Sequence, residues 1–224
     1  MIEDPKQLLI HEFDIAEHNI YVCFADVSDI DVKSEKVRRV LSERRIRRID
    51  GIRKEKAKRL SAGAELMLVN AVKRKYPHAG VPVEYYSDER GKPYFACIEN
   101  TYFSLSHSGD IAACAFSDSP VGIDVQYVRG PNLALAKRFF SEKEYKTVEK
   151  DPEKMFNRIW ARKEAAAKAD GRGIAIGLKE LDVLDSIVRH SGKLYLTIDI
   201  PSPYDGYYIA VSRLIGASQG QDQE

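Results

Sequence analysis

Residues 101–126 read TYFSLSHSGDIAACAFSDSPVGIDVQ, and this stretch decides the fold class. TYFSLSHS and IAACAFS are strand-like runs joined through Gly109, so they predict a β-hairpin. VGIDVQ predicts a further short strand, in which apolar residues flank Asp124. A carboxylate in such a strand is costly to bury unless a cation lies beside it. Asp124 is therefore a candidate ligand of a hard cation such as Mg²⁺, and an aspartate facing solvent at the strand end is an equally strong alternative.

Helical and strand-like stretches alternate on both sides of this segment. Before it, strand-like residues 20–27 precede a helical stretch at 61–76, which Pro77 and Gly80 end. After it, helices are expected at residues 133–150 and 155–169, and strands at residues 178–184, 193–200 and 207–214. The halves of the chain resemble each other faintly, which predicts two similar α+β halves with a cleft between them.

Composition narrows the class of protein. The chain has 224 residues, of which 44% are hydrophobic, so it can bury a sizeable core. It contains no uninterrupted apolar stretch of about 18 residues, so we expect no membrane association. Its three cysteines lack metal-ligand spacing and cannot all pair, which favours a reducing cytoplasm.

Positive charge is concentrated in one segment, although the formal net charge is only +1. Half of the residues from Lys36 to Arg59 are Lys or Arg, which favours docking of a phosphorylated ligand there. A nucleic-acid-binding protein is an alternative. No Phe, Tyr or Trp occurs in this segment to stack on bases, so we expect no nucleic-acid partner.

Two further groups of residues are candidates for catalysis or ligand binding. In WARKEAAAK, Trp160, Glu164 and Lys168 lie four apart and share one helix face, where the carboxylate can serve as metal ligand or base and the ammonium as proton donor. An ordinary surface ion pair is the commoner alternative. In SLSHSGD, Ser106 and His107 are candidates for binding phosphate, and a structural histidine in a turn is the alternative.

Together these motifs resemble a known family of transferases. The sequence is similar to the surfactin-synthetase-activating type of 4′-phosphopantetheinyl transferase over roughly residues 40–215. The resemblance rests on RGKPYF at 90–95, FSLSHSG at 103–109, VGIDVQ at 121–126, FFSEKEY at 139–145 and WARKEAAAK at 160–168.

The resemblance implies a fold and a reaction. The fold is α+β, with two lobes, residues 1–115 and 116–224, related by a pseudo-twofold axis. Apart from the resemblance, the hydrophilic tail ASQGQDQE predicts fraying from about residue 217. Coenzyme A and Mg²⁺, or Mn²⁺, are expected in the cleft of a monomer. A serine hydroxyl of an acyl, polyketide or peptidyl carrier protein attacks the β-phosphate of coenzyme A, and adenosine 3′,5′-bisphosphate leaves.

The resemblance also assigns roles to individual residues. Asp124 and Glu164 correspond to metal-binding acids, and Glu164 is the expected acceptor of the serine proton. Lys168 is expected to assist transfer and neutralise the leaving phosphate. Coenzyme A contacts are implied for Lys92, Ser106, His107 and Lys168, and, for the 3′-phosphate, for Arg44, Arg47 and Arg59.

One position departs from the family pattern. Many members have an acid two residues after the GID aspartate, where this chain has Gln126. An amide oxygen binds a hard cation without contributing charge, so Gln126 is a candidate ligand, and either a water in its place or weaker metal binding is expected. Glu144, from FFSEKEY, matches a family acid near the site, and an ordinary glutamate on a helix surface is an equally strong alternative. A degenerate protein that binds coenzyme A without turnover is the alternative.

The carrier protein is expected to dock on a basic and apolar surface. Residues 133–140, LALAKRFF, combine apolar side chains with Lys137 and Arg138, and follow the strand that carries Asp124. An amphipathic helix packed on the core is the alternative.

Overall fold

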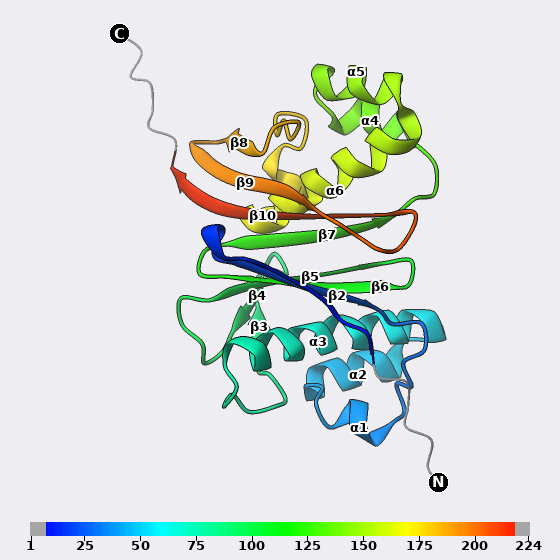
Figure 1. Ribbon diagram of the computed structural model, residues 1–224, viewed down its shortest axis with the longest axis vertical. Coiled ribbons are helices and arrows are strands. Elements are labelled where there is room, and N and C mark those ends of the chain that lie inside the picture. Colours follow the sequence, from blue (N-terminus) through cyan, green and yellow to red (C-terminus); the bar gives the residue numbers. More distant parts are fainter. Residues whose placement is uncertain (1–7, 218–224) are drawn as a thin grey trace.

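The computed structural model describes residues 8–217 and consists of two antiparallel sheets packed between helices (Figure 1). The strand order is β1-β2-β6-β5 in one sheet and β7-β10-β9-β8 in the other. Helix α3 (Glu55–Lys75) covers the outer face of the first sheet, and α6 (Pro152–Asp170) covers the outer face of the second. The mixed α+β class expected from the sequence is confirmed.

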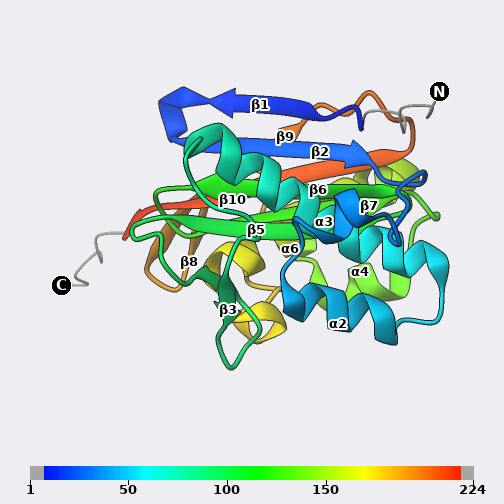
Figure 2. The ribbon, with the colours of Figure 1, turned by 90° about the horizontal axis from the view of Figure 1, so that it is seen from below.

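The first sheet is built from β1 (His11–Ile15), β2 (Ile20–Asp26), β5 (Tyr102–Ser108) and β6 (Ile111–Ser117). Strands β5 and β6 form the expected hairpin, with Ser106 opposite Ala113. The 3₁₀ turn η1 (Ala16–His18) joins β1 to β2. Helices α1 (Glu35–Arg38), α2 (Glu43–Gly51) and α3, and then a ribbon of β3 (Tyr85–Ser87) and β4 (Pro93–Phe95), connect β2 to β5. Figure 2 shows α3 lying along this sheet.

The second sheet contains β7 (Val121–Tyr127), β8 (Ile187–His190), β9 (Lys193–Ile200) and β10 (Tyr207–Ala217). Between β7 and β8 the chain forms α4 (Leu133–Phe139), α5 (Glu142–Lys150), α6 and the 3₁₀ turn η2 (Gly173–Ile176). In both sheets the last strand in sequence lies between the penultimate strand and the strand that precedes the helices, as β2-β6-β5 and β7-β10-β9. The two halves of the chain therefore share a pattern of connections.

Three apolar clusters hold these layers together. One lies between α3 and the first sheet, one surrounds α6, and the third joins the two sheets through residues such as Val22, Ala113, Ile123 and Val211. Helix α6 lies very close to β7. A Cβ atom on Gly122 would be 2.1 Å from the carbonyl oxygen of Ala165, so only glycine permits this approach, which brings α6 onto the strand that carries Asp124.

Two sequence predictions of secondary structure are wrong. Residues 133–150 form two helices, α4 and α5, and residues 178–184 form a turn followed by irregular backbone in place of a strand. Side chains satisfy the backbone of this second segment: Lys163 Nζ donates to the carbonyl oxygens of Leu178 (2.6 Å) and Leu181 (2.5 Å), and Arg162 Nε donates to that of Val183 (2.6 Å). These carbonyls need no neighbouring strand, because each already accepts a hydrogen bond.

Two other expectations concern the ends and the membrane. The tail expected to fray from about residue 217 lies almost entirely outside the described residues. Within residues 8–217, no helix is both long and apolar enough to cross a bilayer.

Candidate active site

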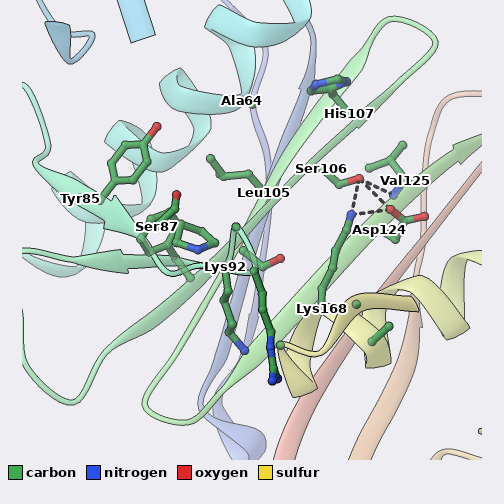
Figure 3. A pocket seen from close by; sticks show the side chains of 18 of the residues that line it. Ala64, Tyr85, Ser87, Lys92, Leu105, Ser106, His107, Asp124, Val125 and Lys168 are labelled. Carbon is green, nitrogen blue, oxygen red and sulfur yellow. Dashed lines mark hydrogen bonds and ion pairs between the residues drawn. The ribbon is translucent and has the colours of Figure 1, made fainter. Parts of the chain in front are cut away.

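A cavity of about 510 Å³ opens where the edge strands of the two sheets meet (Figure 3). Strand β5 contributes Ser106 and His107 to its wall, β7 contributes Asp124 and Gln126, and α6 contributes Lys168. Helix α2, strand β3 and the turn between β3 and β4 complete the wall with Arg44, Arg45, Arg48, Tyr85, Ser87, Arg90 and Lys92, among others. The fold thus brings together residues from segments that are distant in sequence.

An ion pair between Lys168 and Asp124 lies at the centre of this site. Lys168 Nζ is 2.6 Å from Asp124 Oδ1, and it also donates to Ser106 Oγ (3.1 Å) and to the carbonyl oxygen of Ile123 (2.9 Å). The Ser106 hydroxyl donates to the same Asp124 oxygen at 2.9 Å, as the dashed lines in Figure 3 show. Asp124 is only 4% exposed, so the buried carboxylate has the cationic partner that its apolar strand requires.

Two more groups from the sequence prediction lie beside Asp124. Gln126 Nε2 donates to the second carboxylate oxygen, Oδ2, at 2.5 Å. Glu164 lies one helical turn before Lys168, and burial, together with the negative charge of Asp124, raises the pKa of its carboxyl group above the ordinary value. The effect of Asp124 on the pKa of Glu164 indicates that Glu164 lies within electrostatic reach of the Asp124 carboxylate.

His107 faces the basic side of the cavity. Neighbouring residues of a strand point to opposite faces, so Ser106 is directed to β7 and His107 to the side of α2. Burial lowers the pKa of His107, and the positive charges of Lys168, Arg45 and Arg48 lower it further. These surroundings disfavour the imidazolium in the empty cavity and would stabilise a bound anion.

Lys92 closes the opposite end of the cavity. Its Nζ donates to the carbonyl oxygen of Ala169 at 2.5 Å, near the C-terminus of α6, and burial lowers its pKa to about 8. Asp170, the last residue of α6, accepts hydrogen bonds from Lys193 Nζ (3.0 Å) and Tyr195 Oη (2.5 Å). The turn between β3 and β4 is therefore attached to the helix that carries Glu164 and Lys168.

The arginines expected at the 3′-phosphate separate in the structure. Arg44 lines the cavity, with its guanidinium 5.9 Å from the centre of the Tyr85 ring. Arg47 is exposed and pairs with Glu43 at 2.7 Å, and neither it nor Arg59 is among the residues that line the cavity. Arg45 and Arg48 line it instead. Because Arg44 and Arg48 are four apart on α2, helical spacing applied to the basic segment would have found Arg48.

Sequence reasoning also missed Glu65, a fully buried acid on α3. Its Oε1 accepts from the backbone N–H of Ser42 at 2.5 Å, and its Oε2 accepts from Arg45 Nε (2.9 Å) and Tyr85 Oη (2.7 Å). Glu65 thus fixes the start of α2 and the side chain of Tyr85 on β3, two elements of the cavity wall. An acid within the apolar run AGAELML was the available clue.

Glu144 lies elsewhere, contrary to expectation. Its side chain is fully buried, pairs with Lys163 Nζ at 2.8 Å, and accepts from the backbone N–H of Val183 at 2.9 Å. It also completes the capping box of α5 with Ser141. Glu144 is not among the residues that line the cavity, and its hydrogen bonds give it a structural role.

The donor set fits a hard divalent cation. Asp124 and Glu164 carry carboxylate oxygens and Gln126 an amide oxygen, which are the ligand types that Mg²⁺ and Mn²⁺ favour. Glu164 is not among the residues that line the cavity, and Gln126 turns its amide nitrogen to Asp124. Within residues 8–217 there is no cluster of three or more His, Cys, Asp or Glu side chains arranged for a metal. The protein thus offers a few oxygen ligands in place of a complete cage, as is usual where substrate phosphates and water supply the rest.

Comparison with known proteins identifies the family. The sequence model of the 4′-phosphopantetheinyl transferase superfamily matches residues 120–212, which run from β7 to β10. The 4′-phosphopantetheinyl transferase Sfp of Bacillus subtilis (strain 168) is 30% identical over 160 residues, which are 70% of this chain and 69% of that protein. The transferase psf-1 of Bacillus pumilus is 36% identical over 118 residues, 51% of each chain, and HetI of Nostoc is 38% identical over 111 residues, 45% of this chain and 46% of that protein.

The chain therefore belongs to the 4′-phosphopantetheinyl transferase superfamily. The resemblance seen in its motifs is confirmed, and the protein is a transferase of the type represented by Sfp. These relatives give no support to the nucleic-acid-binding alternative or to the degenerate one.

Proposed function

We propose that this enzyme transfers the 4′-phosphopantetheine group of coenzyme A to a serine of an apo carrier protein and releases adenosine 3′,5′-bisphosphate. The observation that carries the proposal is the convergence of Asp124, Lys168 and His107, from both sheets and α6, on one cavity with a basic wall. That arrangement suits a diphosphate substrate, because phosphoryl transfer is accelerated mainly by placing charge around the phosphate oxygens.

The basic wall would hold the nucleotide end of coenzyme A. Arg44 and Arg48 lie on one face of α2 and, with Lys92 across the cavity, offer cations for the phosphates. Arg47 and Arg59 stay predictions for the 3′-phosphate, since they are not among the lining residues. His107 would accept a proton as the diphosphate binds, because an adjacent anion offsets the cations that lower its pKa.

Asp124, Glu164 and Gln126 would hold Mg²⁺ or Mn²⁺, since carboxylate and amide oxygens are the ligands that these ions favour. When bound, the ion would supply positive charge to the diphosphate oxygens. The upward shift of the Glu164 pKa fits this role. Burial and the charge of Asp124 oppose a second negative charge there, and a nearby cation would favour it.

The protein groups would handle charge and protons in the transfer step. The serine oxygen forms a bond to the β-phosphorus while the bond from that phosphorus to the bridging oxygen of the leaving group breaks. Glu164 would accept the serine proton, directly or through a water. Lys168, held by Asp124 and Ser106, would neutralise the charge that develops on the leaving phosphate.

A second cavity, of about 730 Å³, is the proposed docking place of the carrier protein. Ser108 and Gln126 line both cavities, so the second one leads to the first. Its wall includes Arg129 and, from the LALAKRFF segment, Leu135 and the exposed Leu133, whereas Lys137 and Arg138 are not among its lining residues. A partner with acidic and apolar residues around its serine would complement this wall.

The shared connection pattern of the two sheets supports the finer architecture. We propose two lobes, residues 1–115 and 116–224, related by a pseudo-twofold axis, in an enzyme that acts as a monomer. Both sides of the cavity come from one chain, so a partner copy need not complete it.

Mass spectrometry of an apo carrier protein tests the function. The carrier, incubated with enzyme, coenzyme A and Mg²⁺, is expected to gain the mass of one phosphopantetheine group, and EDTA is expected to stop the reaction. A Glu164→Ala variant should leave the carrier unmodified. Absence of any mass gain with acyl, polyketide and peptidyl carriers would overturn the proposal.

A further inference from the structure

Strand β7 has an unusual neighbour along its free edge. It is the edge strand of the second sheet, so the alternate N–H groups that point away from β10 have no strand to donate to. The hydroxyl oxygens of three serines on β5 accept from them. Ser104 Oγ accepts from Ile123 N–H at 3.1 Å, Ser106 Oγ from Val125 N–H at 3.2 Å, and Ser108 Oγ from Tyr127 N–H at 3.1 Å.

This serine ladder, Ser104, Ser106 and Ser108, replaces a backbone ladder between the sheets. The period of two in SLSHS matches the period of the strand, so the three hydroxyls point to the same side. They meet alternate amides of β7 in step. The contact fixes β7 lengthwise against β5, because a slip by one residue would place the hydroxyls opposite residues whose N–H groups point to β10.

The catalytic groups lie on the two strands that the ladder joins. His107 stands on β5 between Ser106 and Ser108, and Asp124 stands on β7 between the amides of Ile123 and Val125. Ser106 is itself part of the site through Asp124 and Lys168. The hydrogen bonds that the structure shows for the hydroxyls of Ser104 and Ser108 go to the β7 backbone.

We propose that Ser104 and Ser108 are positioning residues for the transfer reaction: they hold Asp124, and Lys168 with it, at a fixed place relative to His107. This inference rests on the proposed function. Most cationic groups of the cavity lie on α2 and the β3–β4 turn, away from β7, so the ladder governs the placement of the reacting groups more than coenzyme A affinity.

The test compares Ser104→Ala, Ser108→Ala and the double variant with wild-type enzyme. Hydrogen exchange of the Ile123 and Tyr127 amides should become about tenfold faster or more when their acceptors are removed. The double variant should lose about 10- to 100-fold in kcat, since small misplacements of reacting groups have effects of that size, while KM for coenzyme A stays within about twofold. Ser108→Thr, which keeps the hydroxyl, should restore both readouts.

Ser212→Ala is the matched control. Ser212 is fully buried on β10 in the same sheet as β7, but its hydroxyl bonds to Thr197 at 2.8 Å. It should leave the Ile123 and Tyr127 amides protected. If the double variant does not fold, Ser108→Ala alone decides, because Ser108 is only half-buried.

The outcomes separate the two proposals. Unchanged exchange at Ile123 and Tyr127, or an equal loss of kcat in Ser212→Ala, would overturn the positioning role while wild-type transfer stands. Wild-type enzyme that transfers nothing would overturn the proposed function and the positioning role together, and the exchange rates would still show whether the ladder protects β7.

Discussion

The ammonium of Lys168 lies 2.6 Å from Oδ1 of Asp124, although the two residues are 44 positions apart in the chain. Their side chains are 31% and 6% exposed, so the pair sits at the cavity wall with the carboxylate buried behind the ammonium. The close packing of α6 on Gly122 brings them together. The buried carboxylate of Asp124 therefore has a cationic partner within hydrogen-bonding distance, although its strand is otherwise apolar.

Removal of this ammonium should stop transfer. Lys168→Met keeps most of the side-chain volume but is expected to lower kcat by about 10²- to 10³-fold, because the positive charge that neutralises the leaving phosphate is lost. Since Lys168 also lowers the pKa of His107, an NMR titration of the variant should show that pKa higher than in wild type. Lys146→Met, at an exposed ion pair on α5, should change neither. An unchanged kcat in Lys168→Met would contradict the assigned role.

Glu164 should make stability depend on pH. Burial and Asp124 raise its pKa, so the folded protein binds this proton more tightly than the unfolded chain. Stability is therefore lost as pH rises from the ordinary glutamate range through the folded pKa. Glu164→Gln should raise the thermal midpoint at about pH 7 and change it little near pH 4, where the carboxyl group is largely protonated. A lower thermal midpoint for Glu164→Gln than for wild type at neutral pH would contradict the predicted direction of the stability change.

Two neighbouring arginines should differ sharply in their effect on substrate binding. Arg48 lines the cavity, whereas Arg47 is exposed and pairs with Glu43. Arg48→Ala is expected to raise KM for coenzyme A by about 10- to 100-fold, the usual effect of losing a charge-assisted hydrogen bond, and Arg47→Ala by less than about threefold. Steady-state kinetics with varied coenzyme A measures both. Equal effects would mean that the substrate lies along a different face of α2.

The buried pair of Glu144 and Lys163 should matter for stability. Both side chains are fully buried, so Glu144→Ala leaves an uncompensated ammonium and should lower the free energy of unfolding by about 3–5 kcal/mol. Glu142→Ala, which breaks an exposed pair with Lys146 on the same helix, should cost less than about 1 kcal/mol. Denaturant titration compares the two. A Glu144→Ala protein as stable as wild type would show that the pair contributes little.

The sequence by itself determined the local elements and the residues that local spacing relates. The hairpin of β5 and β6 and the strand VGIDVQ were predicted correctly, because their apolar runs and turn residues act over a few positions. The shared face of Glu164 and Lys168 followed from helical periodicity in the same way. The family followed from several short motifs in a fixed order, and comparison with relatives confirmed it.

Only the tertiary structure decided which polar groups meet. Residues 178–184 do not form a strand, because Arg162 and Lys163 on α6 donate hydrogen bonds to carbonyl oxygens of this segment. Arg48 lines the cavity and Arg47 does not, since one step along a helix turns a side chain by about 100°. Packing of the helices also buries Glu65, which contacts residues of α2 and β3. The hydrogen bonds of the serine ladder likewise depend on the tertiary structure. A hydroxyl's partner depends on which backbone lies beside it, and that neighbour is fixed by the packing of the whole chain.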